Sequence, residues 1–562
     1  MKQELTIVLS GEAGQGLATL EDFLVKAISK TYYVFATTEV MSRVRGGNNS
    51  LEIRISNTPV YAYKEHIDFL YLLNNHSLYR LTDRVDSNSK VFGEVDFITH
   101  EEHEQLSSQF IPLALTDSAK SAGNVLFSNT VLFGQIAGIL NLNVEDCHTL
   151  ISERFSTKNE TIQLGNIKAF DIGFEIGMPY QSEHKLVPQK TGHMKIFTGA
   201  EAIGIGSLGG GCNFIASYPM SPGTGVLTYL ASKSNAFGVF VEQAEDEIAA
   251  LNMAIGAWYA GARALVTTSG GGFALMEEAV SLSGITETPC VTHIGQRPGP
   301  GTGLPTRTGQ EDLNLVVYAG HGEFPRLIYA PGTMEDAIVL SQKAFYMADK
   351  YQIPTFILSD QFLLDSKFQM APFEMDGKYL ESFVVESETN YQRYKLTENG
   401  VSPRAIPGNG KGLVKCDSDE HTEDGLITES FDVRVQMNDK RNSKMPLLLD
   451  DYEMPELIGP ANYTNLIVGW GSTYGVLKEY IDYGDSNDTA YLYIKQPFPL
   501  HPDIKKYFDQ AKHIIGVENN VTAQFARLLK LELDIKVTDH LLKYNGVPFS
   551  IEEITNYMKE VL

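Results

Sequence analysis

The feature that most constrains the fold is an alternation of short apolar runs with segments of helical periodicity. It is clearest between residues 193 and 370, where each apolar run has the length of a strand and is followed by apolar residues at helical spacing. Such alternation predicts a parallel sheet covered by helices on both faces, the α/β class. The runs are KIFTG, FGVFVE, ARALVTTS, PCVTHIGQ and TFILSD.

The same alternation occurs at both ends of the chain. It starts in LTIVLSGEAGQGLATLEDFLVKAISK and returns in TNLIVGW, AYLYIKQ and HIIGVEN. Roughly 150 residues per domain would divide 562 residues into three or four domains. We therefore predict three α/β domains, at residues 1–185, 193–370 and 456–562, with an acidic connector at 371–455. The connector's acidic run of Asp417, Asp419, Glu420, Glu423 and Asp424 is expected to be a solvated loop.

Charge and cysteine content exclude several classes of protein. The chain has 45 Lys and Arg against 70 Asp and Glu, a formal charge of −25, which phosphate backbones and anionic lipids would repel. Its 4 cysteines stand singly, too few and too scattered for a zinc pair, a disulfide framework or an iron–sulfur cluster. There is neither a signal-peptide pattern nor an apolar stretch of about 18 residues. We expect a cytoplasmic protein that binds no nucleic acid, membrane or metal.

Two glycine patterns could indicate nucleotide binding. Gly11-x-x-Gly14-x-Gly16 lies where a strand passes into a helix, so it could receive an anion, although a tight turn without a ligand explains it as well. The pattern Gly204-x-Gly206-x-x-Gly209 has the dinucleotide spacing. However, the residues before it already have helical periodicity and no acidic residue follows about 20 positions later, which argues against a Rossmann site.

The loop GQRPGPGTGLPTRTG follows a predicted strand, where open α/β sheets bind ligands. Its Arg297 offers a planar donor pair that suits a carboxylate, although the loop could be structural only. The segments Tyr218-Pro219-Met220-Ser221 and Ser269-Gly-Gly-Gly272 also follow predicted strands or helices. Glu247 begins an Ala-rich helix, where its carboxylate either complements the helix dipole or accepts a proton from a bound heterocycle.

Taken together, these motifs resemble the α subunit of the 2-oxoacid:ferredoxin oxidoreductases, in the form with a γ domain fused ahead of the α chain. GEAGQG and Arg45-Gly46-Gly47 resemble the γ domain. The segment DSDEHTEDGLITE and the pair Lys440-Arg441 are most similar to 2-oxoglutarate members. The other matching segments are EAIGIGSLGGGCNFIASYPMSPGTG, DEIAALNMAIGAWYAGARALVTTSGGG, QRPGPGTGLPTRTGQEDL, GWGSTYG, KQPFPLHP and GVENN.

The resemblance implies a thiamine-pyrimidine-binding central domain, a transketolase-C-like C-terminal domain, and an enzyme that acts with a β subunit. Such enzymes convert a 2-oxoacid and coenzyme A into acyl-CoA, carbon dioxide and reduced ferredoxin. In the family, thiamine diphosphate lies between the α and β subunits of an (αβ)₂ assembly. The β subunit holds the diphosphate, Mg²⁺ and a [4Fe–4S] cluster.

By position in the motifs, Glu247 would hydrogen-bond the thiamine aminopyrimidine as the catalytic carboxylate, with Tyr218, Pro219 and Ser269 also at the cofactor. Arg297 would bind the substrate carboxylate beside Ser221 and Thr302. Ser221 replaces a threonine found in many members, and Gly301 replaces a serine. Two alternatives stay open: a thiamine-dependent dehydrogenase or transketolase-like subunit without redox clusters, and an inactive binding protein on the same fold.

Overall fold

The computed structural model describes residues 3–41, 47–106, 109–484 and 487–562. Arg45 and Gly46 of the γ-like motif lie outside these ranges. The chain forms two compact units. The N-terminal unit comprises Met1–Phe197, Ser366–Phe373 and Ser550–Glu552, and the larger unit comprises Thr198–Asp365, Glu374–Phe549 and Glu553–Leu562.

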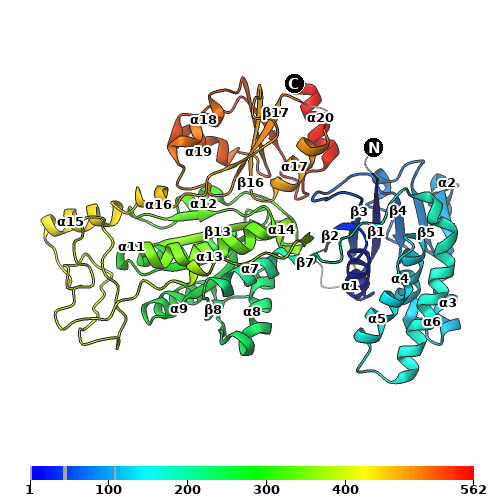
Figure 1. Ribbon diagram of the computed structural model, residues 1–562, viewed down its shortest axis with the longest axis horizontal. Coiled ribbons are helices and arrows are strands. Elements are labelled where there is room, and N and C mark those ends of the chain that lie inside the picture. The colour runs from blue at the N-terminus through cyan, green and yellow to red at the C-terminus, as the bar shows by residue number, and fades with distance from the viewer. Residues whose placement is uncertain (1–2, 42–46, 107–108, 485–486) are drawn as a thin grey trace. The chain divides into compact units, whose positions relative to one another are not determined.

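The N-terminal unit is built on an 8-stranded sheet of order β6-β5-β4-β1-β3-β2-β14-β7 (Figure 1). The sheet is mixed, because β1 pairs in parallel with β4 but antiparallel with β3. Its strands are β1 (Glu4–Glu12), β2 (Tyr33–Glu39), β3 (Asn48–Ser56), β4 (Phe69–Leu72), β5 (Lys90–Gly93), β6 (Phe110–Pro112), β7 (Lys195–Thr198) and β14 (Lys367–Met370). The alternation in the sequence correctly indicated α/β structure but did not reveal the antiparallel pairs.

Two strands join this sheet from segments that the sequence assigned to the central domain. β7 contains the first four residues of the run KIFTG, and β14 pairs antiparallel with β2. A short strand at a sheet edge carries little periodicity, so its partner sheet is set by tertiary contacts. The unit's helices are α1 (Leu17–Ile28), α2 (His100–Leu106), α3 (Leu115–Ala122), α4 (Ser128–Ile139), α5 (Val144–Arg154) and α6 (Glu160–Gly177).

The larger unit contains a 6-stranded sheet of order β12-β13-β11-β10-β8-β9, in which every recorded pairing is parallel. Its inner strands are buried along their length, which explains their nearly continuous apolar runs. The strands are β8 (Phe214–Ser217), β9 (Phe240–Gln243), β10 (Ala264–Ser269), β11 (Cys290–Gln296), β12 (Leu327–Tyr329) and β13 (Pro354–Asp360).

Helices cover this sheet, and one of them contains the apparent dinucleotide motif. Gly204, Gly206 and Gly209 all lie within α7, as the helical periodicity indicated. A Cβ at Gly206 would lie 2.3 Å from the carbonyl oxygen of Ile338 in α13, so this glycine allows close helix packing. The helices are α7 (Gly199–Gly209), α8 (Thr224–Phe237), α9 (Glu247–Tyr259), α10 (Gly270–Ala274), α11 (Glu277–Thr286), α12 (Leu313–Val317), α13 (Met334–Tyr351) and α14 (Gln361–Asp365).

A 5-stranded sheet of order β15-β17-β16-β18-β19 forms the C-terminal part of the larger unit. It is parallel except for the edge strand β15. Its strands are β15 (Glu456–Ile458), β16 (Asn465–Trp470), β17 (Thr489–Ile494), β18 (His513–Glu518) and β19 (Asp539–Leu542). The helices of this region are α17 (Thr473–Tyr483), α18 (Lys505–Phe508), α19 (Gln524–Leu533) and α20 (Ile551–Val561).

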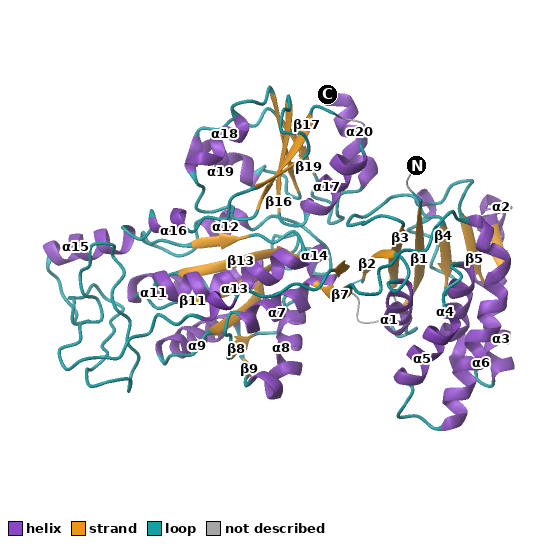
Figure 2. Ribbon diagram, in the orientation of Figure 1, coloured by secondary structure: helices purple, strands orange, loops and turns teal. Residues whose placement is uncertain are grey.

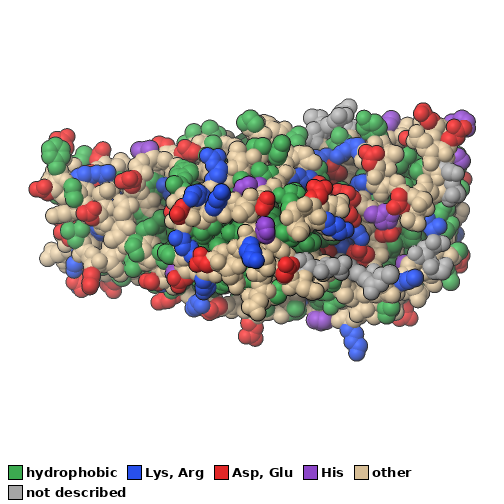
Figure 3. Space-filling view, turned by 90° about the horizontal axis from the view of Figure 1, so that it is seen from above, with side chains coloured by type: hydrophobic (Ala, Val, Ile, Leu, Met, Phe, Trp, Pro, Cys, Tyr) green, Lys and Arg blue, Asp and Glu red, His purple; other side chains and the backbone are tan. Residues whose placement is uncertain are grey.

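The segment from residue 371 to 455 has few regular elements, and Figure 2 draws most of it as loop. Its helices are α15 (Phe431–Asn442) and α16 (Leu447–Asp450). Figure 3 shows acidic and basic side chains interspersed over the face in view. None of the helices in the described part of the chain is long and apolar enough to span a bilayer.

Candidate active site

Four neighbouring parallel strands place the predicted site residues at one edge of the 6-stranded sheet. Tyr218 follows β8, Ser269 ends β10, and Arg297 follows β11. Glu247 begins α9, shortly after β9. The registers pair Ser217 with Gln243 and Ser269 with Gly295, so the carboxyl ends of these strands lie at similar heights. This is the edge at which open α/β sheets bind ligands.

Glu247 is buried, with 4% of its surface exposed, and its Oε1 has no hydrogen-bond partner within the described ranges. The helix does not use this carboxylate as its cap, because the side chain of Asp246 accepts the hydrogen bond from the amide of Ala249. A buried carboxylate oxygen without a partner is costly. The arrangement therefore favours the second of the two predicted roles, a carboxylate that meets a ligand.

The glycines after β10 leave room for the site's carboxylates. A Cβ at Gly272 would lie 2.6 Å from Oε1 of Glu247, and a Cβ at Gly270 would lie 2.1 Å from Oδ2 of Asp312. Ser269 precedes them, and its buried Oγ finds no hydrogen-bonding partner in the part of the chain that is described. Only a glycine fits between each carboxylate and the backbone at these positions.

Arg297 lies in the same place, with 8% of its surface exposed. Its Nη1 donates to the carbonyl oxygen of Ser221 at 2.9 Å, and its Nη2 lies 3.5 Å from the sulfur of Met220. Burial lowers the pKa of the Arg297 guanidinium, while the nearby Asp312 carboxyl opposes this effect. Its buried Nε has no partner among the residues described. One edge of the guanidinium is thus held while Nε remains available.

The remaining predicted site residues are less enclosed. Ser221 is exposed, and the atom that contacts Arg297 is its carbonyl oxygen rather than its hydroxyl. Thr302 is exposed in the loop after β11. Tyr218 is 39% exposed, and Pro219 is half-buried. The structure brings Glu247, Ser269 and Arg297 to one sheet edge as buried groups with unpaired atoms, whereas these four form its open side.

Sequence reasoning did not identify Asp312, whose Oδ2 is also buried and lacks a partner within the described chain. Burial raises the pKa of the Asp312 carboxyl to about 7, with Glu311 adding to this effect and Arg297 opposing it. The residue follows the glycine-rich loop in the motif GQEDL. Its place directly after the glycine-rich loop was the only signal available in the sequence.

His293, in the middle of β11, is a structural residue. Its Nδ1 lies 2.8 Å from Oγ1 of Thr267 on β10, and its Nε2 lies 2.7 Å from Oγ of Ser359 on β13. Burial lowers the pKa of His293 to about 3, so the ring is neutral near pH 7. It cross-links three strands within the sheet and does not act as a proton carrier for the site.

Lys440 and Arg441, in the connector, each form an ion pair within the protein. The Nζ of Lys440 lies 2.6 Å from Oε1 of Glu287, and Lys444 binds the other carboxylate oxygen. Arg441 donates to both carboxylate oxygens of Glu420, at 3.0 and 2.8 Å. Four of these charged side chains are buried: Glu287, Lys440, Arg441 and Lys444.

The expectation that the acidic run is entirely a solvated loop was therefore wrong at Glu420. The carboxylate of Glu420 is largely covered, and the residue that follows it, His421, is fully buried. The misjudgement arose because charge density alone does not reveal partners distant in the sequence, here Arg434 and Arg441. Asp419 and Asp424 are exposed, as expected for such a run.

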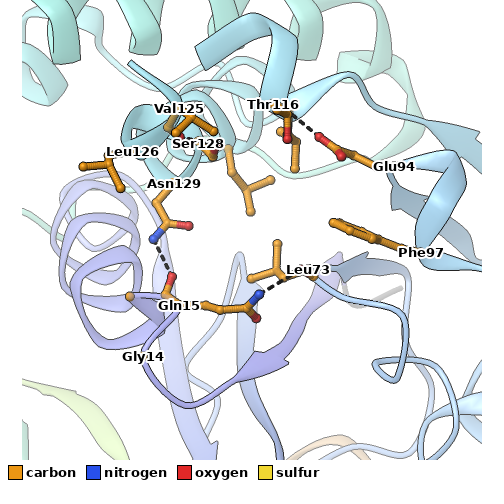
Figure 4. A pocket seen from close by; sticks show the side chains of 13 residues that line it. Gly14, Gln15, Leu73, Glu94, Phe97, Thr116, Val125, Leu126, Ser128 and Asn129 are labelled. Carbon is orange, nitrogen blue, oxygen red and sulfur yellow. Dashed lines mark hydrogen bonds between the residues drawn. The ribbon is translucent and has the colours of Figure 1, made fainter. Parts of the chain in front are cut away.

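The N-terminal unit has a separate cavity of about 460 Å³ at the glycine turn (Figure 4). Gly14 and Gly16 have φ values of 92° and 77°, which favour glycine. Nδ2 of Asn129, near the start of α4, donates to the carbonyl oxygen of Gln15 at 2.7 Å and fixes the turn. Opposite the turn, Glu94 accepts a hydrogen bond from the amide of Thr116 at 2.6 Å. The glycine turn therefore borders a cavity.

Comparisons with known proteins agree with this description. The family described as "Pyruvate ferredoxin/flavodoxin oxidoreductase" matches residues 6–176, and "Pyruvate flavodoxin/ferredoxin oxidoreductase, thiamine diP-bdg" matches residues 205–440. A 2-oxoacid:ferredoxin oxidoreductase subunit alpha from Sulfolobus sp. is 30% identical, over 99% of this chain and 97% of the relative. The 2-oxoglutarate synthase subunit KorA of Archaeoglobus fulgidus is 31% identical, over 58% of this chain and 88% of its own.

A solved structure extends the likeness to the whole fold. The 2-oxoglutarate:ferredoxin oxidoreductase from Magnetococcus marinus, with 2-oxoglutarate, coenzyme A and succinyl-CoA bound, matches with a TM-score of 0.92 and 28% identity. The match covers 100% of both chains. From the identity and coverage of these relatives, the chain belongs to the alpha subunits of the 2-oxoacid:ferredoxin oxidoreductases, a family of oxidoreductases.

Proposed function

We propose that this chain, with a β subunit, catalyses the thiamine-dependent oxidative decarboxylation of a 2-oxoacid, 2-oxoglutarate in particular. Coenzyme A would be converted to the acyl-CoA and ferredoxin would be reduced. The observation that carries the proposal is the group of buried polar atoms at the sheet edge, on Glu247, Ser269 and Arg297, that have no partner among the residues the structure describes. Unpaired buried groups of opposite character around one place are what a polar ligand would satisfy.

The residues at this edge suit the pyrimidine end of thiamine diphosphate. Glu247 offers a buried acceptor, Oε1, to a ring nitrogen, and Gly272 keeps the space beside that carboxylate free. Ser269 adds a hydroxyl that can donate or accept. When bound, the cofactor supplies the carbon nucleophile and electron sink that decarboxylation of a 2-oxoacid requires. The role of Glu247 is to hold a proton between its Oε1 and the ligand.

Arg297 provides the charge for a substrate carboxylate. The Ser221 carbonyl fixes its guanidinium, so a carboxylate can bind without first ordering a long side chain. Ser221 and Thr302 present hydroxyl groups from the open side. The preference for 2-oxoglutarate is supported by relatives of that specificity, the KorA proteins and the Magnetococcus marinus enzyme. The Lys440-Arg441 pair does not support it through a free charge, because Lys440 is paired with Glu287 and Arg441 with Glu420.

The cavity at Gly14 and Gly16 is our candidate site for part of coenzyme A. Its glycine turn precedes α1, and backbone amides at such a turn favour phosphate groups. The Magnetococcus marinus structure contains coenzyme A, which supports a role for this cosubstrate in the present chain. Asn129→Ala should then raise the KM for coenzyme A while leaving the KM for the 2-oxoacid unchanged.

A β subunit would complete the site and hold the diphosphate, Mg²⁺ and the [4Fe–4S] cluster. Exposed apolar side chains occur around the open edge, as expected where a partner covers it. Ile248 follows Glu247 directly, Leu275 follows α10, and Leu304 lies in the loop after β11. Their exposed fractions are 50%, 53% and 46%.

The test is to co-express the chain with its β subunit and to measure the reduction of ferredoxin or methyl viologen. This reduction should require both a 2-oxoacid and coenzyme A. We expect activity with a panel of 2-oxoacids, highest with 2-oxoglutarate, and acyl-CoA as a product. Glu247→Gln in the same complex is the matched control for background reduction. A complex that retains thiamine diphosphate and releases carbon dioxide from the 2-oxoacid, with an aldehyde as the other product and no reduction of the viologen, would favour the alternative without redox clusters.

A further inference from the structure

We propose that Asp312 is an additional substrate-binding residue, whose carboxyl group in its protonated form donates a hydrogen bond to the carboxylate held by Arg297. The proposal rests on the proposed function, because it assumes a 2-oxoacid at Arg297. It assigns a role to a residue that neither the glycine-rich loop nor the thiamine-binding helix contains. Substrate binding would then be linked to the uptake of one proton.

The position of Asp312 places its carboxyl group at the site. Its amide donates to Oε1 of Gln296 at 3.1 Å, which ties the residue to the last position of β11, next to Arg297. Its carboxyl group lies against Gly270, where a Cβ would be 2.1 Å from Oδ2 and 2.4 Å from Oδ1. Gly270 follows Ser269 directly. Asp312 therefore lies between the residues proposed to meet the cofactor and the residue proposed to meet the substrate.

Asp312 and Arg297 interact electrostatically, yet no ion pair within 4.0 Å is recorded between them in the described part of the chain. Each also keeps a buried atom without a partner, Oδ2 of Asp312 and Nε of Arg297. An acid and a base that are buried and close normally pair with each other. Since Arg297 and Asp312 do not pair with each other, a ligand that bonds to both would satisfy Nε of Arg297 and Oδ2 of Asp312 together.

Residues that follow β18 or begin α19 hold the segment that carries Asp312. Gln310 donates from its amide to the carbonyl oxygen of Asn519 at 2.7 Å and accepts from the Asn519 amide at 3.0 Å through its Oε1. Nδ2 of Asn520 donates to the carbonyl oxygen of Gln310 at 3.0 Å. Gln524 donates to the carbonyl oxygen of Glu311 at 2.7 Å and accepts from the amide of Asn314 at 2.8 Å. These bonds on both sides of Asp312 limit its movement away from Gly270.

Burial and the charges around Asp312 decide whether its carboxyl group is protonated or ionised. Glu311, adjacent in the chain, is acidic and Arg297 is basic. The carboxylate of Glu247 lies against Gly272, two residues after the glycine that Asp312 contacts. Burial raises the pKa of Asp312 to about 7, so both forms are populated near neutrality. A substrate carboxylate at Arg297 would add a negative charge and favour the protonated form further. That form has an O–H donor for the substrate, whereas the ionised form would repel it.

Asp312→Asn provides the test, because an amide keeps the shape and a donor but cannot ionise. In the complex with the β subunit, we expect the wild-type KM for 2-oxoglutarate to rise by about tenfold for each pH unit above about 7. In Asp312→Asn, the KM should be nearly constant from pH 6 to 9, with kcat changed by only a few fold. A structural role alone would change KM equally at every pH, and that result would overturn the proposal.

Glu311→Gln is the matched control, because it removes the neighbouring negative charge while its Oε atom can still accept the hydrogen bond from the amide of Gly299. This variant should keep the pH-dependent KM but move its midpoint to lower pH, because Glu311 contributes to the raised pKa of Asp312. If Glu311→Gln abolished the dependence and Asp312→Asn did not, the assignment to Asp312 would be wrong.

A second measurement uses the wild-type complex and does not depend on the folding of any variant. Calorimetric titration with 2-hydroxyglutarate, an unreactive probe with the same two carboxylates, is performed at pH 8 in two buffers of different ionisation enthalpy. Uptake of about one proton per site supports the proposal, and no uptake overturns it. A wild-type complex inactive with every 2-oxoacid would overturn the proposed function together with this inference. Activity with an unchanged pH dependence in Asp312→Asn would overturn the inference alone.

Discussion

Gly272 lies so close to Glu247 that a Cβ at position 272 would be 2.6 Å from Oε1 of the carboxylate. The same Cβ would lie 2.2 Å from Oγ1 of Thr268 on β10. Contacts this short require the Glu247 carboxylate and the Thr268 hydroxyl to move. The absence of a side chain at Gly272 is therefore a condition for the buried position of Glu247.

Gly272→Ala should displace the Glu247 carboxylate and reduce kcat by about 10²-fold, the loss typical of a group moved by about 1 Å. The αβ complex should still assemble, which gel filtration can check alongside the turnover assay. Gly256→Ala is the control, because a Cβ at Gly256, in the middle of α9, meets nothing within 4 Å. That control should retain activity and gain up to about 1 kcal/mol of stability. Equal activity of the two variants would contradict the role of Gly272.

Glu247→Gln should preserve the fold and subunit assembly but lower turnover by at least about 10²-fold, the contribution of a positioned proton-transfer group. An amide matches the size of the carboxylate but cannot carry its negative charge. Glu245→Gln is the matched control, since Glu245 is exposed two residues earlier. If Glu245→Gln lost activity and Glu247→Gln did not, Glu245 would be the partner of the cofactor.

The sequence was sufficient to predict the α/β class and the main strands, because long buried strands leave nearly continuous apolar runs. It was insufficient for β7 and β14, which are four residues long and take their sheet from tertiary contacts. The antiparallel pairing of β1 with β3 was also not predictable, because strand direction does not affect the apolar pattern.

The candidate site was predictable where a motif identifies it and not where distant segments create it. Ser269 ends a strand, and Glu247 and Arg297 come shortly after strands, so the topology rule for open sheets locates all three. The position of Asp312 depends on the nearby Gln310, which is held by Asn519 and Asn520, 209 and 210 residues further along the sequence. Such contacts leave no local periodicity.

Arg297→Lys should not restore function, because a lysine replaces a planar donor pair with a point charge. Loss of one charge-assisted hydrogen bond costs about 1.5 to 3 kcal/mol, or about 10 to 200-fold in kcat/KM. The reduction should be similar for every 2-oxoacid, since all share the carboxylate, and thiamine diphosphate should be retained. Substrate panels and cofactor analysis of the purified complex test this. A change in preference between pyruvate and 2-oxoglutarate without a general loss would place Arg297 at the distal end of the substrate.

Glu287→Gln should destabilise the protein through the connector. Burial alone would raise the pKa of Glu287, but the ammonium groups of Lys444 and Lys440 hold it well below its usual range. The substitution leaves both ammonium groups buried without an ionised partner, which typically costs about 3 to 5 kcal/mol. Urea unfolding measures the difference. Glu429→Gln, exposed in the same connector, should change stability by less than about 0.5 kcal/mol. Similar midpoints for the two variants would show that the buried cluster does not hold the connector.

Low pH should reduce the stability that Glu420 gives to the folded connector. Burial alone would raise the pKa of Glu420, but hydrogen bonds from Arg441 and Arg434 outweigh it and lower the pKa from 4.5 to about 2. A carboxylate with a lowered folded-state pKa stabilises the fold above its unfolded pKa, because the unfolded chain binds the proton more tightly. The contribution of Glu420 is therefore complete above pH 4.5 and is lost as the pH falls from 4.5 towards 2.

Thermal unfolding of the wild type and of Glu420→Gln between pH 6 and pH 3 tests this contribution. The two proteins should differ most at pH 6 and converge as the pH falls, because protonation makes the wild-type side chain as neutral as glutamine. Asp424→Asn removes an exposed carboxylate from the same acidic run and should follow the wild-type profile. Parallel profiles for the wild type and Glu420→Gln would mean that the arginine contacts of Glu420 do not stabilise the folded connector.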